Sequence, residues 1–264
     1  EDLAVKRELF EALERIAAPD AILATNTSAL SVSEIASATS TPERVVGMHF
    51  FNPAPVLPLV EVIRTAHTSD EVFDAAYAFV QRVGKEPVAC NDTPGFVVNR
   101  ILIPLLNDCV RVLDEARVAP DDVDRAMRFG ANWPIGPCAL IDLIGVDVHV
   151  HASEALHAAL GEERMAPPDR LRRMQAEGNL GRKTGQGFFA YPQPDEGDQR
   201  ETVLLETRGD IAIAWLNRPP ANPLSPQAVR DLIDLWEQIQ GRARALVIAS
   251  SNIFTFSAGA DIKE

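Results

Sequence analysis

The sequence predicts an α/β protein built from three segments, and the order of its helical and strand patterns carries this prediction. Helical and strand patterns alternate over residues 1–92, helical patterns alone follow over residues 93–191, and alternation returns over residues 201–264. Residues 192–200 are rich in Pro, Gln, Asp and Gly, a composition typical of a linker. Because helices that alternate with strands usually cover a parallel sheet, we expect such a sheet in the first segment.

The first segment opens with an amphipathic helix over residues 2–18, where apolar residues recur at helical spacing between charged ones. Ser31 and Glu34 form a capping box that predicts a short helix through about Ala38. Residues 69–83 predict a further helix. The predicted strands are short apolar runs, at residues 21–25, 45–50, 59–64 and 87–90.

The second segment carries helical patterns that are broken by Gly and Pro. Its predicted helices are residues 96–116, 120–129, 138–160 and 168–177. In the third segment, the patterns predict a hairpin, then a helix, then a strand, at residues 202–216, 225–240 and 245–250. The third segment therefore looks like the opening of a second α/β unit.

Charge and composition exclude several classes of protein. The chain has 264 residues, with 38 acidic and 25 basic side chains, which gives a formal net charge of −13. An acidic surface repels the phosphates of nucleic acids and of anionic membranes. The sequence contains no apolar run near the roughly 18 residues that span a bilayer, and its first residues are not typical of a signal peptide. We therefore expect a cytoplasmic protein without nucleic-acid or membrane partners.

The chain contains three cysteines, Cys90, Cys109 and Cys138, scattered without a CxxC pair or neighbouring histidines. This spacing predicts neither a disulfide framework nor a metal site. We expect all three to be buried as small apolar residues.

Polar residues at the ends of predicted strands indicate a site for acid–base chemistry. Asn26 and Ser28 follow one strand, His49 closes the next, Glu61 lies inside the strand after it, and Asn99 lies on the first helix of the second segment. Taken singly, most of these residue types are ordinary turn or surface residues. Glu61 is different, because a carboxylate on a buried strand needs a partner. A histidine, a carboxylate that orients it and two hydrogen-bonding groups suit chemistry on an alcohol or carbonyl.

Six motifs extend this pattern over most of the chain. They are NTSALS at 26–31, MHFFNP at 48–53, LVEVI at 59–63, TPGFVVNR at 93–100, GPCALIDLIGVD at 136–147 and GRKTGQGFFAY at 181–191. With these motifs in this order, residues 1–191 resemble the 3-hydroxyacyl-CoA dehydrogenase family. The resemblance implies a partial Rossmann-type NAD-binding domain over residues 1–92 and an all-helical dehydrogenase C-terminal domain over residues 93–191. It also implies NAD-dependent oxidation of a 3-hydroxyacyl-CoA to a 3-ketoacyl-CoA, in fatty-acid β-oxidation or a related acyl-CoA pathway.

The resemblance assigns roles to the polar residues. It implies that His49 is the base that takes the proton of the 3-hydroxyl group and that Glu61 orients His49. It implies that Ser28 and Asn99 position the substrate oxygens. By the same resemblance, the cofactor side of the site includes four further residues, Glu1, Lys6, Asn26 and Asn52.

The glycine loop that binds the NAD pyrophosphate is expected upstream of this chain, which then is a piece of a longer protein. Gly185–Ala190 satisfies the pattern G-x-G-x-x-A, yet no predicted strand precedes it and no helix follows it. We therefore reject this segment as a dinucleotide-binding loop.

The third segment contains GDIAIAWLNRP at 209–219 and FSAGADIKE at 256–264. With these motifs, residues 201–264 resemble the start of the crotonase, or enoyl-CoA hydratase, family. The resemblance implies a crotonase-like α/β domain in which the backbone N–H of Ala258 is one donor of an oxyanion hole. It also implies a bifunctional protein that hydrates an enoyl-CoA and oxidises the product. A homo-oligomer formed through the helical domain would follow the habit of the dehydrogenase family.

Two other interpretations stay open at this point. The first is a non-catalytic acyl-CoA-binding or structural homologue, although such a protein has no physical need for a base and its orienting carboxylate. The second keeps the dehydrogenase and gives the crotonase part an isomerase activity.

Overall fold

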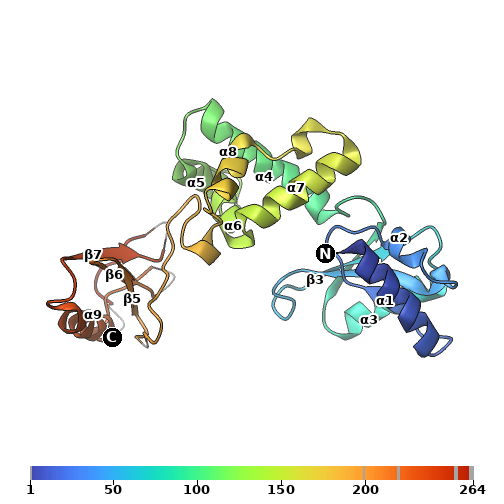
Figure 1. The fold of residues 1–264 in the computed structure, drawn as a ribbon, viewed down its shortest axis with the longest axis horizontal. Helices are drawn as coiled ribbons and strands as arrows, with labels where there is room; N and C mark the ends of the chain where they lie inside the picture. Colours follow the sequence, from blue (N-terminus) through green and yellow to red (C-terminus); the bar gives the residue numbers. More distant parts are fainter. Residues whose placement is uncertain (1, 199, 219–220, 253–254, 262–264) are drawn as a thin grey trace. The chain divides into compact units, whose positions relative to one another are not determined.

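The structure is a computed structural model that describes residues 2–198, 200–218, 221–252 and 255–261 (Figure 1). The chain divides into two compact units, one of Glu1–Asp108 with His151–Pro167 and one of Cys109–Val150 with Pro168–Glu264. The divisions fall inside two helices and so differ from the segments that the sequence patterns suggest.

The first unit holds a four-stranded sheet with helices on both faces. Its elements are α1 (Leu3–Ile16), β1 (Leu23–Thr25), α2 (Val32–Ala36), a 3-10 turn (Pro42–Arg44), β2 (Val45–Phe50), β3 (Leu59–Arg64), α3 (Asp70–Arg82), β4 (Glu86–Asn91) and parts of α4 (Val98–Glu115) and α7 (Val146–Leu160). Every helix and strand predicted in the first segment is present, with bounds that differ by a few residues. The predicted cap is also confirmed in part, because the Ser31 hydroxyl accepts a hydrogen bond from the Glu34 N–H at the start of α2.

The sheet has the order β1-β2-β3-β4, and its central pair runs antiparallel. β1 pairs with β2 and β3 pairs with β4 in parallel. The expectation of a parallel sheet is therefore wrong for β2 and β3. Residues 51–58 connect these two strands, and a parallel pair needs a crossover of about a dozen residues or more. As a result, the carboxyl end of β2 and the amino end of β3 lie at the same end of the sheet.

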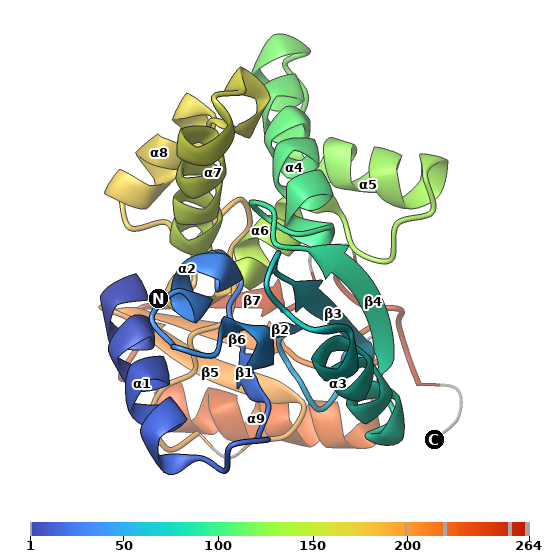
Figure 2. The same cartoon turned by 90° about the vertical axis from the view of Figure 1, so that its right-hand side faces the viewer.

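Helices α1 and α2 cover one face of this sheet and α3 covers the other (Figure 2), and the core side chains alternate between the two faces along the strands. Val45 and Ile63 face α1 and α2, and the neighbouring Val46 and Val62 face α3. All four side chains are fully buried, and burial of one such side chain contributes about 1.5–3 kcal/mol. The sheet is thus fixed from both sides, which holds the strand ends in place.

The second unit contains the remaining helices and a smaller sheet. Its elements are the remainders of α4 and α7, then α5 (Pro120–Gly130), α6 (Pro137–Ile144), α8 (Asp169–Ala176), β5 (Val203–Arg208), β6 (Ile211–Leu216), α9 (Pro226–Ile239) and β7 (Ala245–Ser250). The single helix predicted over residues 138–160 is wrong. Gly145 has a φ of 104°, which side-chain-bearing residues rarely adopt, and it separates α6 from α7.

The third segment forms the predicted hairpin, helix and strand. β5 and β6 pair antiparallel, and β7 pairs parallel with β6. Leu205, Ala214 and Leu235 are buried in the core that α9 forms with β5 and β6.

Three expectations about composition can be compared with the structure. Within the described ranges, no helix is long and apolar enough to cross a membrane. The same described residues contain no cluster of His, Cys, Asp and Glu that could hold a metal ion. All three cysteines are free thiols; Cys109 and Cys138 are buried as expected, whereas Cys90 is only half-buried.

Candidate active site

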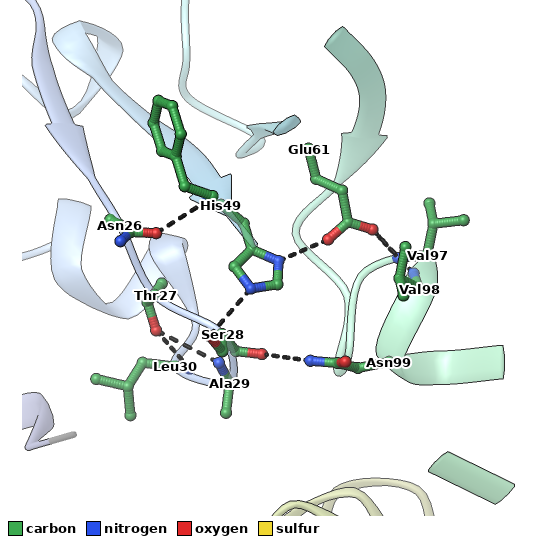
Figure 3. A network of polar contacts seen from close by, with 11 residues as sticks. Asn26, Thr27, Ser28, Ala29, Leu30, His49, Glu61, Val97, Val98 and Asn99 are labelled. Atoms are coloured by element: carbon green, nitrogen blue, oxygen red, sulfur yellow. Dashed lines mark hydrogen bonds and ion pairs between the residues drawn. The ribbon is translucent and has the colours of Figure 1, made fainter. Parts of the chain in front are cut away.

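His49 lies near the end of β2 and is held by hydrogen bonds at both ring nitrogens (Figure 3). Its Nδ1 is 2.7 Å from Oε2 of Glu61, and its Nε2 is 3.0 Å from the hydroxyl oxygen of Ser28. The residue is 3% exposed. The rings of Phe51 and Phe96 lie 4.4 and 5.7 Å from the imidazole, centroid to centroid. His49 is therefore an oriented side chain whose Nε2 points toward Ser28.

Glu61 is completely buried and its two carboxylate oxygens have different partners (Figure 3). Oε2 meets His49, while Oε1 accepts hydrogen bonds from the backbone N–H groups of Val97 and Val98, both at 2.9 Å. Burial by itself raises the pKa of Glu61, but the hydrogen bonds from His49, Val98 and Val97 outweigh it and leave the pKa lowered. Glu61 is thus a fixed negative charge that links the histidine to the start of α4.

The loop after β1 brings Ser28 to this pair. The Thr27 hydroxyl accepts hydrogen bonds from the N–H groups of Ala29 and Leu30 at 3.4 and 3.0 Å, which bends the backbone into a tight turn. Asn99, the second residue of α4, donates from Nδ2 to the carbonyl oxygen of Ser28 at 3.3 Å. The structure therefore brings together the four residues Ser28, His49, Glu61 and Asn99.

Three residues around this cluster were missed by sequence reasoning. Phe51 and Phe96 pack against the imidazole, and Thr27 shapes the turn that carries Ser28. A signal for Thr27 existed, because a hydroxyl residue directly after a strand often bonds to the backbone of the following turn. Nothing local in the sequence distinguishes the two phenylalanines from other core aromatics.

The residues predicted on the cofactor side have different surroundings. Lys6 donates from Nζ to the carbonyl oxygen of Asn26 at 3.0 Å, and so lies at the carboxyl end of β1. The side-chain oxygen of Asn26 accepts a hydrogen bond from the N–H of Phe50 at 3.1 Å. Asn52 is exposed in the loop that follows β2. Glu1 lies outside the described residues.

The donors at this edge fit a nicotinamide cofactor. Asn26 and Asn52, both exposed, follow β1 and β2, and the ammonium group of Lys6 on α1 reaches the carboxyl end of β1. In open α/β sheets, ligands bind outside the carboxyl ends of such strands. Amide and ammonium groups match the carboxamide and ribose hydroxyls of the cofactor.

The Gly185–Ala190 segment has a structural role, which confirms that it is no dinucleotide-binding loop. The N–H groups of Phe188 and Phe189 donate to the carboxylate of Asp142 at 2.9 and 3.0 Å, and the Tyr191 hydroxyl donates to it at 3.0 Å. A Cβ atom on Gly187 would lie 2.1 Å from that carboxylate. The backbone amides that a phosphate would need are therefore occupied, and the glycine is required for close packing.

The expectation for Ala258 is wrong in this structure. Its backbone N–H donates to the carbonyl oxygen of Ala221 at 2.8 Å, so it is not free to bind an oxyanion. The end of the same motif, residues 262–264, lies outside the described residues.

Two family models match the chain. The 3-hydroxyacyl-CoA dehydrogenase NAD-binding domain matches residues 1–93, and the C-terminal domain of the same family matches residues 95–191.

Similar proteins carry related names. A probable 3-hydroxybutyryl-CoA dehydrogenase of Bacillus subtilis is 45% identical over 193 residues, which are 73% of this chain and 67% of that protein. The human mitochondrial hydroxyacyl-coenzyme A dehydrogenase is 43% identical over 192 residues, 72% of this chain and 61% of that protein. Among solved structures, FadB2 of M. tuberculosis superposes with a TM-score of 0.71 at 42% identity, covering 73% of this chain and 68% of the other.

Proposed function

The chain belongs to the 3-hydroxyacyl-CoA dehydrogenase family, and we propose that it oxidises a 3-hydroxyacyl-CoA to the 3-ketoacyl-CoA with NAD. The fold agrees with this membership, since a Rossmann-like NAD-binding domain precedes a helical dehydrogenase domain. The single observation that carries the proposal is the buried His49–Glu61 pair, with Nε2 of the histidine directed at Ser28.

The arrangement supports a proton transfer at Nε2. The imidazole is the side chain best suited to exchange a proton near neutral pH, and the Glu61 carboxylate at Nδ1 stabilises the imidazolium that forms. A substrate hydroxyl beside Nε2 also lies within hydrogen-bond reach of Ser28. The Ser28 hydroxyl group then positions the substrate oxygen at C3. Asn99 places its side-chain amide beside Ser28. Asn26, Asn52 and Lys6 would hold NAD, which would supply the acceptor for the hydride of C3.

The test is NADH oxidation with acetoacetyl-CoA, measured for the full-length protein and for His49→Gln. We expect loss of NADH in the wild type and at least a hundredfold lower rate in the variant, with acyl-CoA binding retained. Equal rates would contradict the role of His49. A wild type that binds acetoacetyl-CoA without oxidising NADH would favour the non-catalytic binding protein.

For the third segment, we propose a crotonase-like domain over residues 201–264, joined by the linker at 192–200 to the dehydrogenase domains at 1–92 and 93–191. The motif resemblance and the β5-β6-α9-β7 order support it. Hydration of crotonyl-CoA by the full-length protein tests the hydratase assignment. Isomerisation of a 3-enoyl-CoA without hydration would favour the isomerase instead.

We also propose a homo-oligomer formed through the helical domain. Ile101 and Leu105 on α4 are 60% and 37% exposed and lie four residues apart on one side of the helix, and adjoining exposed apolar side chains are typical of an interface. Light scattering after size-exclusion chromatography measures the oligomeric state, and a monomeric mass would contradict the proposal. The cytoplasmic location is a proposal from composition, which cell fractionation tests.

A further inference from the structure

A cavity of about 320 Å³ opens beside two residues of the site, Ser28 and Asn99. All the residues that line it belong to the first unit. Leu30, Phe96 and one face of α7 form apolar parts of its wall. This volume is at the lower end of the roughly 300–1,000 Å³ range of ligand pockets. The cavity thus starts at the atoms that would hold C3 of a substrate and continues along apolar side chains.

The charges of the wall exclude an anionic occupant. Among the described residues that line the cavity, none is Lys or Arg, and two carry carboxylates, Glu34 and Asp92. Asp92 is already used, because it accepts hydrogen bonds from the Ser31 hydroxyl at 2.8 Å and from the N–H groups of Val32 and Ser33 at 3.1 and 2.7 Å. The phosphates of coenzyme A would be repelled from such a wall. An uncharged, mainly apolar group fits it.

The α7 face is lined by small residues where the cavity is open. Ala152, Ala155 and Ala159 line it together with Leu156, and the spacing of three and four residues places them on one side of the helix. Leu156 packs closely against Gly95, because a Cβ atom on Gly95 would lie only 2.9 Å from Cδ2 of Leu156. The wall is therefore closed at this point. Where the helix carries alanine, the room remains for a ligand. A larger side chain at these positions would occupy that room.

We propose that this cavity holds the alkyl chain of the substrate beyond C3 and that Ala155, with the alanines one turn to either side, sets the longest chain accepted. This inference rests on the dehydrogenase function proposed above and adds its acyl-chain specificity. Burial of one methylene contributes about 0.8 kcal/mol, or about a fourfold gain in affinity. Specificity for longer chains should therefore rise about fourfold per carbon until the cavity is full.

The experiment compares Ala155→Leu with Ala158→Leu in the full-length protein. Ala158 is an exposed residue on the same helix that does not line the cavity, so it receives the same substitution without filling the pocket. The measured quantity is kcat/KM for 3-ketoacyl-CoA substrates with straight chains of increasing length. We expect Ala155→Leu to lower the ratio of the eight-carbon to the four-carbon value about tenfold or more, while Ala158→Leu keeps the ratio of the wild type. Ala159→Leu should act like Ala155→Leu and replaces it if that variant fails to fold.

Two outcomes would overturn the inference. An unchanged ratio in both cavity variants means that the alkyl chain lies elsewhere. An equal loss for every chain length means that the cavity holds a part common to all substrates, such as the pantetheine arm.

A separate measurement distinguishes this failure from failure of the proposed function. Calorimetric affinities of 3-hydroxyacyl-CoA thioesters for the same variants need no turnover. If the wild type oxidises no NADH, these affinities still show whether Ala155→Leu selectively weakens the longer chains.

Discussion

His49 and Glu61 are register partners across the antiparallel strands β2 and β3, and their side chains meet at 2.7 Å. Directly opposite residues of an antiparallel pair project to the same face, with Cβ atoms about 4.5–5.5 Å apart. The strand pairing itself therefore builds the histidine–carboxylate pair. The other oxygen of Glu61 reaches Val97 and Val98 at the start of α4, so one carboxylate fixes both His49 and the turn before Asn99.

Glu61→Gln should lower kcat about a hundredfold or more, because the neutral amide cannot stabilise an imidazolium at His49. The amide also places an N–H₂ donor against groups that themselves donate, which should cost about 1–3 kcal/mol of unfolding free energy. Steady-state kinetics and urea unfolding measure the two effects. Glu43→Gln, at an exposed position before β2, is the matched control and should change neither. Wild-type kcat in Glu61→Gln would contradict the orienting role.

The lowered pKa of Glu61 predicts how stability depends on pH. Burial opposes ionisation, yet the hydrogen bonds from His49, Val98 and Val97 bring the folded-state pKa below the ordinary value of 4.5. The ionised group therefore stabilises the fold above about pH 4.5 and loses this contribution as the pH falls further. We expect the difference in unfolding free energy between the wild type and Glu61→Gln to be complete at neutral pH and to shrink in acid. Denaturant titrations at several pH values measure it, and a difference that grows in acid would contradict the assigned direction.

Ser28→Ala tests the group at Nε2 of His49. The hydroxyl lies 3.0 Å from that nitrogen, and a hydrogen bond contributes about 1 kcal/mol, so kcat should fall about fivefold to tenfold. Because Ser28 is exposed, the thermal midpoint should stay close to that of the wild type. Ser33→Ala, a few residues further on in α2, removes a hydroxyl outside this cluster and is the control. A loss of stability without a rate effect would make Ser28 a structural residue.

Local patterns were sufficient to predict the helices and strands of the first segment, but they do not show whether two neighbouring strands run parallel or antiparallel. The short apolar runs at residues 45–50 and 59–64 fit a parallel pair and an antiparallel pair equally well. The brevity of the connection between them was the available signal, because it is too short for a crossover helix. Similarly, apolar periodicity continues across residues 138–160, and only the backbone conformation of Gly145 divides α6 from α7.

The four polar residues of the site were found because their types and positions suit acid–base chemistry. The sequence could not show that Glu61 also holds the start of α4, since this depends on a contact between positions 36 and 37 residues apart. The cavity walls were missed for a similar reason. Ala155 and Leu30 become neighbours of one cavity only in the folded chain.

Asp142 supports a final prediction about stability. Its carboxylate accepts hydrogen bonds from the N–H groups of Phe188 and Phe189 and from the Tyr191 hydroxyl, and the residue is 1% exposed. Asp142→Asn replaces one acceptor with a donor that faces donors, so it should cost about 1–3 kcal/mol of unfolding free energy. Hydrogen exchange at Phe188 and Phe189 should accelerate in parallel. Asp74→Asn, an exposed change in α3, controls for the loss of charge, and equal unfolding free energies of the two variants would show that the buried carboxylate does not hold this segment.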